Sequence, residues 1–150
     1  MNGNSRSDLL ETLACTCFAA RKAARVITQQ YERQLKPTGL RVSQFTALSV
    51  LSIAGPLALS QLAEQLGMER TTLTRNLRPL LARGWVTESA VRDGRVRLLA
   101  VTKQGTAVAH AALPRWREAQ RAIARQLGGD AVRALAAASE AATSRGVGRR

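Results

Sequence analysis

Four arginines and three threonines crowd one short segment of the chain. Residues 67–86 read GMERTTLTRNLRPLLARGWV, in which Leu73, Leu77, Leu80 and Leu81 recur at helical spacing. On a helical wheel these leucines share one face, and hydroxyls and guanidiniums occupy the opposite face and one flank. A guanidinium can bond guanine bidentately, and a threonine offers a hydroxyl or a methyl to a base edge. The pattern is typical of a helix that reads the major groove of DNA.

A second group of arginines follows, around an Asp-Gly pair. Val and Thr are enriched on both sides of Asp93-Gly94, which predicts a β-hairpin with a tight turn. Arginines on such a hairpin fit the minor groove, where A·T tracts concentrate negative potential. Asp93 favours the turn and can pair with Arg95 and fix its direction. The residues expected to contact DNA are Arg70, Thr71, Thr72, Thr74, Arg75, Arg78, Arg92, Asp93, Arg95 and Arg97. We expect Arg83 to be solvated surface charge.

The overall charge of the chain points to an anionic partner. Its 150 residues hold 23 Lys and Arg against 10 Asp and Glu, a formal net charge of +13. Such a charge suits nucleic acid or an anionic membrane. We expect double-stranded DNA and no membrane, because the arginines gather on the two segments above and no basic helix rich in aromatics is present. A sequence-independent, nucleoid-type nucleic-acid-binding protein is the alternative that charge alone would produce.

Enzymatic chemistry finds no support in the residues. The sequence lacks a nucleophile–base pair, a metal-ligand cluster, a phosphate-binding loop and a dinucleotide fingerprint. We therefore expect no enzyme activity, no cofactor and no metal. It also has no apolar run long enough to span a membrane and no signal-peptide pattern, so we expect a cytoplasmic protein.

The first half of the chain reads as a series of helices. A stripe of apolar residues at spacings of three and four predicts one helix over residues 8–36. Ser43 is the expected N-cap of a second helix and Ser60 that of a third, which ends at Gly67. Residues 57–59 between them fit a short strand.

The second half continues with the arginine-rich helix, the hairpin and further helices. Pro79 predicts a kink or an early end in the arginine-rich helix. The hairpin spans residues 86–101, and Thr102 is the expected cap of a long helix that Pro114 bends. Asp130 is the expected cap of a last helix.

This order predicts a mainly α protein with a small β-hairpin wing, an α+β winged helix-turn-helix with N- and C-terminal dimerisation helices. The DNA-binding domain covers residues 40–102. Residues 1–36 and 103–143 form the helical dimerisation region, because their apolar stripes exceed what the small domain needs. An intramolecular bundle is the alternative. Residues 144–150 form a basic flexible tail.

Two phrases of the sequence resemble the MarR family of winged-helix transcriptional regulators. They are LSQLAEQLGMERTTLTRNLRPLLARGWV and RDGRVRLLAVTKQG, with the family's D-x-R wing at residues 93–95 and a T-x-x-G at residues 102–105. The resemblance implies a homodimer that binds a pseudo-palindromic operator, usually as a repressor. It also implies release by a small aromatic or phenolic effector or by oxidation of a cysteine.

The cysteines bear on the second kind of signal. The segment CFAARKAARVITQQY resembles the start of the hydroperoxide-sensing branch of this family. The resemblance implies that Cys17 is the reactive cysteine and that Tyr31 is one of the tyrosines that hold its thiolate. Arg21 replaces the nearer tyrosine, and its guanidinium can lower the pKa of a thiol. The alternative is that Cys17, which lies on the apolar stripe, is an inert packing residue. Cys15 and Cys17 point nearly opposite ways on a helix, which argues against a joint metal site.

Overall fold

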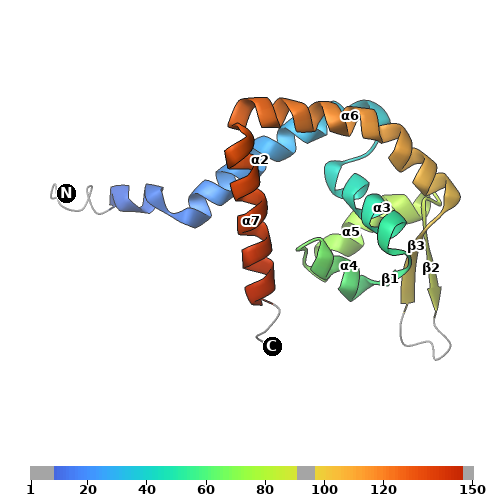
Figure 1. Ribbon diagram of the computed structural model, residues 1–150. Coiled ribbons are helices and arrows are strands. Elements are labelled where there is room, and N and C mark those ends of the chain that lie inside the picture. The colour runs from blue at the N-terminus through green and yellow to red at the C-terminus, as the bar shows by residue number, and fades with distance from the viewer. Residues whose placement is uncertain (1–8, 91–96, 147–150) are drawn as a thin grey trace.

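The computed structural model describes residues 9–90 and 97–146, and these are mainly helical with one small sheet. The elements in chain order are η1 (Thr12–Ala14), α2 (Thr16–Leu35), η2 (Lys36–Thr38), α3 (Val42–Ala54), β1 (Leu57–Ala58), α4 (Leu59–Gln65), α5 (Arg70–Ala82), β2 (Val86–Ala90), β3 (Arg97–Val101), α6 (Lys103–Leu127) and α7 (Gly129–Gly146). Figure 1 shows two parts, which we call the lobe (α3 to β3) and the arm (residues 9–35, α6 and α7). The expected fold class, a mainly helical winged helix, is confirmed.

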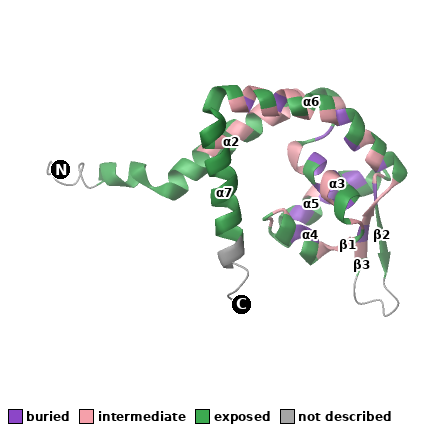
Figure 2. Ribbon diagram, in the orientation of Figure 1, coloured by how far each residue is buried: buried purple, intermediate pink, exposed green. Residues whose placement is uncertain are grey.

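The lobe contains most of the apolar core, to which the arm adds Leu35 of α2 and part of α6. The fully buried side chains of α3, α4 and α5 meet there with one residue from each long strand; they are Leu48, Leu51, Leu62, Leu73, Leu77, Leu80, Val86 and Leu99. The first half of α6 covers this core with Ala109 and Ala112, which are buried at 7% and 0% exposure. Figure 2 shows the buried residues gathered in the lobe and along α6. Burial of this apolar surface is the main force that holds the helices of the lobe together.

The sheet confirms both strand predictions. Its order is β1-β3-β2 and all its pairs are antiparallel. Leu57 of β1 pairs with Leu99 of β3, and β2 pairs with β3 from Val86↔Val101 to Ala90↔Arg97. The turn at Asp93-Gly94 lies outside the described residues.

Three of the expected helix caps, Ser43, Ser60 and Asp130, are wrong. Helix α3 begins at Val42, because the N–H of Arg41 donates to the Gln44 side chain (3.0 Å) and the N–H of Val42 donates to the Glu32 carboxylate (3.1 Å). Ser43 is therefore inside the helix. Helix α4 likewise has Ala58 as its N-cap, and the side chain of Gln61 accepts from the Ala58 N–H at 2.9 Å. In both places a glutamine reaches back over the first turn, so the serine is not needed there.

The first helix is interrupted where one continuous helix was expected. Residues 9–11 are helical and η1 follows, but Cys15 is extended (φ −62°, ψ 127°) and α2 starts only at Thr16. The threonines and cysteines here are weak helix formers, and Thr12 directs its hydroxyl to the carbonyl of Leu9 (2.7 Å). Residues 9–22 are all exposed, so packing within the chain does not compensate for these weak propensities.

The two internal prolines differ in outcome. Helix α5 does not end early at Pro79 but continues to Ala82. Pro114 lies inside α6, and this helix bends along its length as expected (Figure 1). Thr102 caps α6 as predicted, with its hydroxyl oxygen accepting from the Gly105 N–H at 3.1 Å. Helix α7 begins at Gly129, one residue before the expected cap Asp130.

Glycine at position 105 is required by close packing between α6 and the lobe. A Cβ atom built on Gly105 would lie 2.1 Å from the carbonyl oxygen of Trp85. The hydroxyl of Thr102 also donates to the Gly84 carbonyl at 2.8 Å. The start of α6 is therefore fixed to the turn between α5 and β2.

Candidate nucleic-acid interface

Helix α5 exposes the residues that the sequence assigned to DNA. Leu73, Leu77 and Leu80 face the core at 0–1% exposure, while the six polar residues predicted on this helix are all exposed; they are Arg70, Thr71, Thr72, Thr74, Arg75 and Arg78. The helical wheel also placed Leu81 on the core face, and this prediction is wrong, because Leu81 is 36% exposed. The leucine stripe thus fixes α5 on the lobe and leaves one long polar face outward.

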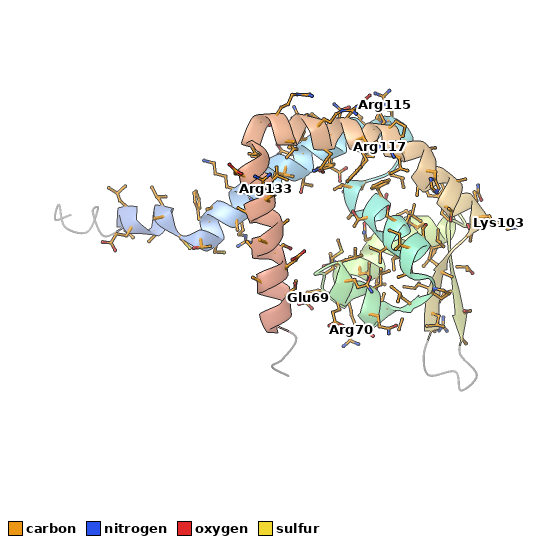
Figure 3. All side chains as sticks on the ribbon, in the orientation of Figure 1. Glu69, Arg70, Lys103, Arg115, Arg117 and Arg133 are labelled. Atoms are coloured by element: carbon orange, nitrogen blue, oxygen red, sulfur yellow. The ribbon has the colours of Figure 1, made fainter. Side chains whose placement is uncertain are left out.

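The start of α5 lies at an end of the lobe, far from the arm's α6. Figure 3 shows Glu69 and Arg70 at the edge of the molecule opposite Arg115 and Arg117. The hydroxyl of Thr74 donates to the carbonyl of Arg70 at 2.8 Å, within the helix. Its hydrogen is therefore engaged, and Thr74 can offer an incoming group only a methyl or an acceptor oxygen.

The wing is described only in part. Arg97 lies on β3 and forms an ion pair with Glu88 of β2 at 3.3 Å, with the side chains 70% and 36% exposed. Such an exposed pair is weak, so it leaves the Arg97 guanidinium able to turn toward a phosphate. Arg92, Asp93 and Arg95 lie outside the described residues, and the expected Asp93–Arg95 pairing stays a prediction.

Sequence reasoning missed the role of Arg83. Its guanidinium lies 4.8 Å from the ring centroid of Trp85 and donates to the carbonyl of Gly39 at 3.3 Å. Gly39 has a positive φ of 73° and ends η2. Arg83 therefore ties the end of α5 to the turn between α2 and α3, although its side chain is still exposed. Its position two residues before a tryptophan was the signal that could have predicted a contact with an aromatic ring.

The three residues proposed for oxidation sensing do not meet within one chain. Cys17 and Arg21 are exposed, one turn apart on α2. Tyr31 is fourteen residues further along the same helix, or about 21 Å. Its hydroxyl donates to the side chain of Gln120 on α6. Burial raises the pKa of Tyr31 above its usual value of 10.0. Any contact between Cys17 and a tyrosine therefore requires a second protomer.

Residues 9–90 and 97–146 form neither a metal site nor a membrane-spanning helix. These residues hold no cluster of three or more His, Cys, Asp or Glu side chains placed to bind a metal. No helix among them is both long enough and apolar enough to cross a membrane.

The chain is similar to known DNA-binding regulators. A family model described as "MarR family" matches residues 38–96. An uncharacterised HTH-type transcriptional regulator of Bacillus subtilis, YwoH, is 34% identical over 83 residues, which are 55% of this chain and 61% of YwoH. Those 83 residues span about three fifths of that curated relative.

Solved structures match over more of the chain. The Mycobacterium tuberculosis transcriptional regulator MosR, solved in complex with DNA, is 37% identical with a TM-score of 0.75, and the match covers 87% of this chain and 97% of MosR. The reduced form of AbfR, solved bound to DNA, is 26% identical with a TM-score of 0.65, covering 77% of this chain and 84% of AbfR. The likeness therefore includes both the lobe and most of the arm.

Proposed function

Because this chain belongs to the MarR family of transcriptional regulators, we propose that it binds a specific DNA operator as a homodimer and represses nearby genes. The observation that carries the proposal is the outward face of α5, where six polar residues stand exposed over a buried leucine stripe. The similar proteins MosR and AbfR were both solved bound to DNA. Such a repressor works in the cytoplasm, next to the chromosome.

Dimerisation is supported by apolar side chains that the arm leaves uncovered. Leu9, Leu10, Leu13, Phe18, Val26, Leu127 and Leu135 are 40–67% exposed, and all of them lie before residue 36 or after residue 126. Figure 2 shows the N-terminal part of α2 and nearly all of α7 as exposed. So many exposed large apolar side chains in one part of the molecule favour a protein partner. A second copy of the same arm, related by a two-fold axis, would cover them.

The dimer would place one α5 helix in each half-site. Two recognition helices about 34 Å apart enter successive major grooves on one side of the duplex. We assign Arg75 to a base edge and Thr71 and Thr72 to bases or phosphates. The wing residues Arg92 and Arg95 would lie in the flanking minor groove, where narrow A·T tracts attract guanidiniums.

A signal that releases DNA is the second part of the proposal. The candidates are a small aromatic or phenolic effector and oxidation of Cys17, with Arg21 beside it and the partner's Tyr31 across the dimer. Hydroperoxide treatment, with Cys17→Ser as the control variant, separates the two. If hydroperoxide abolishes DNA binding only in the chain that has Cys17, oxidation is the signal. If a phenolic compound abolishes DNA binding in both the wild type and Cys17→Ser, a small-molecule effector is the signal.

Selection of bound duplexes from a random pool, at physiological salt, tests the DNA-binding proposal. The expected result is one enriched pseudo-palindrome with half-sites about one helical turn apart. High affinity with no enriched motif would instead establish the sequence-independent, nucleoid-type alternative. Salt dependence does not separate the two, because both would release counterions from phosphates.

A further inference from the structure

Beside α5 the lobe has a hollow of ≈ 420 Å³ whose walls carry positive charge. One wall is the start of α3, with Arg41 and Ser43, and the other is the flank of α5, with Thr72, Arg75 and Asn76. None of the lining residues is Asp or Glu. A concave surface with two guanidiniums and no carboxylate concentrates positive potential and favours an anion.

The guanidinium of Arg41 is free to bind that anion. Within residues 9–90 and 97–146, Arg41 takes part in no ion pair, unlike Arg97. The nearby backbone is already occupied, since the N–H groups of Arg41 and Val42 donate to the side chains of Gln44 and Glu32. The exposed side chain, rather than the helix terminus, is therefore the group that remains available.

The two walls of the hollow are held in a fixed relation. The hydroxyl of Ser43 donates to Oδ1 of Asn76 at 2.9 Å, which joins the first turn of α3 to the middle of α5. Nδ2 of Asn76 is buried and has no hydrogen-bond partner among the described residues. The wall thus holds an unused donor in addition to its two cations. Because α3 and α5 are joined here, the backbone that carries Arg41 has a defined place beside α5.

We propose that Arg41 is a further DNA-contacting residue, which binds a backbone phosphate at this hollow, next to the base-reading face of α5. The inference rests on the proposed function, and it assigns a contact that the recognition helix and wing do not supply. A phosphate held between α3 and α5 fixes the register and depth of α5 in the groove, while the outward residues of α5 read the bases. Arg41 would therefore contribute affinity on any duplex and little sequence preference.

The first test is Arg41→Ala in the full chain, measured on the selected operator and on a random duplex over a range of salt. Two phosphate contacts are lost per dimer, so the slope of log K against log salt should become less steep by about 1.8. Affinity should fall by roughly tenfold or more, equally on both duplexes. Arg41→Lys should restore most of the slope. The matched control is Arg117→Ala, which removes an exposed arginine on α6 at the far side of the molecule (Figure 3) and should change neither value.

The second test locates the contact on the DNA. Neutral methylphosphonates are placed one at a time along the operator backbone. One position should weaken wild-type binding and have no added effect on Arg41→Ala. If the wild type selects a motif but Arg41→Ala has the same salt slope as Arg117→Ala, Arg41 does not contact phosphate and this inference is wrong. If the wild type selects no motif at all, the proposed function itself fails.

Discussion

Few large apolar side chains of the lobe are exposed, whereas many of those in the arm are exposed. In the lobe six leucines of α3, α4 and α5 are at 0–1% exposure, and each has its neighbours within the same chain; they are Leu48, Leu51, Leu62, Leu73, Leu77 and Leu80. In the arm, Leu10 and Leu13 are 59% exposed and Leu135 on α7 is 46% exposed. One chain therefore contains a part with a finished core and a part whose apolar surface is still open.

The difference separates what one chain can do from what requires two. A finished core holds α5 in a defined place, so its exposed polar face is already formed in the protomer. An open apolar surface has a cost in water that a partner removes. We therefore attribute local DNA recognition to the lobe and the spacing of two half-sites to the arm.

The largest expected effect comes from opening the core of the lobe. Leu80→Ala should lower the free energy of unfolding by about 2–5 kcal/mol, since it removes a fully buried leucine. The matched control is Leu81→Ala, the next residue along the same helix, which is 36% exposed and should cost much less. Urea unfolding of the two variants gives the comparison. An equal loss of unfolding free energy in both variants would contradict the different burial of Leu80 and Leu81.

A charge placed on the open surface of the arm should prevent dimerisation. Leu135→Glu would bury an unpaired carboxylate from each protomer in the proposed interface, and should weaken association by roughly a hundredfold, about 2.7 kcal/mol. Ile53→Glu is the control, because Ile53 is 86% exposed but lies on the lobe. Light scattering over a range of concentrations measures the change. Dissociation by Ile53→Glu, and not by Leu135→Glu, would move the interface to the lobe.

The loss of base reading by α5 should have a smaller effect than the two changes above, but one confined to particular base pairs. Arg75→Ala should reduce affinity for the selected operator by about 1–3 kcal/mol and relax the preference at one position of each half-site. Arg78→Ala, on the same exposed face, is the comparison, and selection from a random pool with each variant is the measurement. If Arg75→Ala keeps the original motif, Arg75 does not read a base.

The smallest effect concerns the junction of α2 and α6 within the arm. Burial raises the pKa of Tyr31, so the folded chain holds this proton more tightly than the unfolded chain. The stabilisation is complete below about pH 10 and is lost as the pH rises through the higher pKa of the folded state. Tyr31 is the only tyrosine in the chain, so its ionisation can be followed by absorbance. A midpoint at or below 10 would contradict the burial described here, and Tyr31→Phe should remove the signal.

Much of the lobe was predictable because its signals are local. The leucine spacing of α5, the Thr102 cap and the Val-rich strands each depend on neighbouring residues, and all were found in the structure. The errors arose where distant or competing partners decide the outcome. Glu32 reaches from α2 to the start of α3, and Gln61 reaches back over α4, so Ser43 and Ser60 do not cap.

The polar face of the candidate site was predictable from the sequence, but its hollow was not. The exposure of the polar face of α5 follows from a helical wheel, but the hollow beside Arg41 depends on how α3 crosses α5. The link from Arg83 to Gly39 joins residues 44 positions apart. The break at Cys15 had no periodic signal, since the apolar stripe continues through it. The hollow and the Arg83 link need the tertiary arrangement and are not encoded in any short segment. The break at Cys15 follows instead from weak local helix propensities that no packing within the chain offsets.

The most direct test of this account is the mass of the protein in solution, alone and bound to its selected duplex, by sedimentation. The account predicts two chains in the free particle and two chains on each operator, because the arm is closed by a second copy and each lobe occupies one half-site. A single chain on the operator, with the free protein also monomeric at the same concentration, would contradict it. The open surface of the arm would then need a different partner.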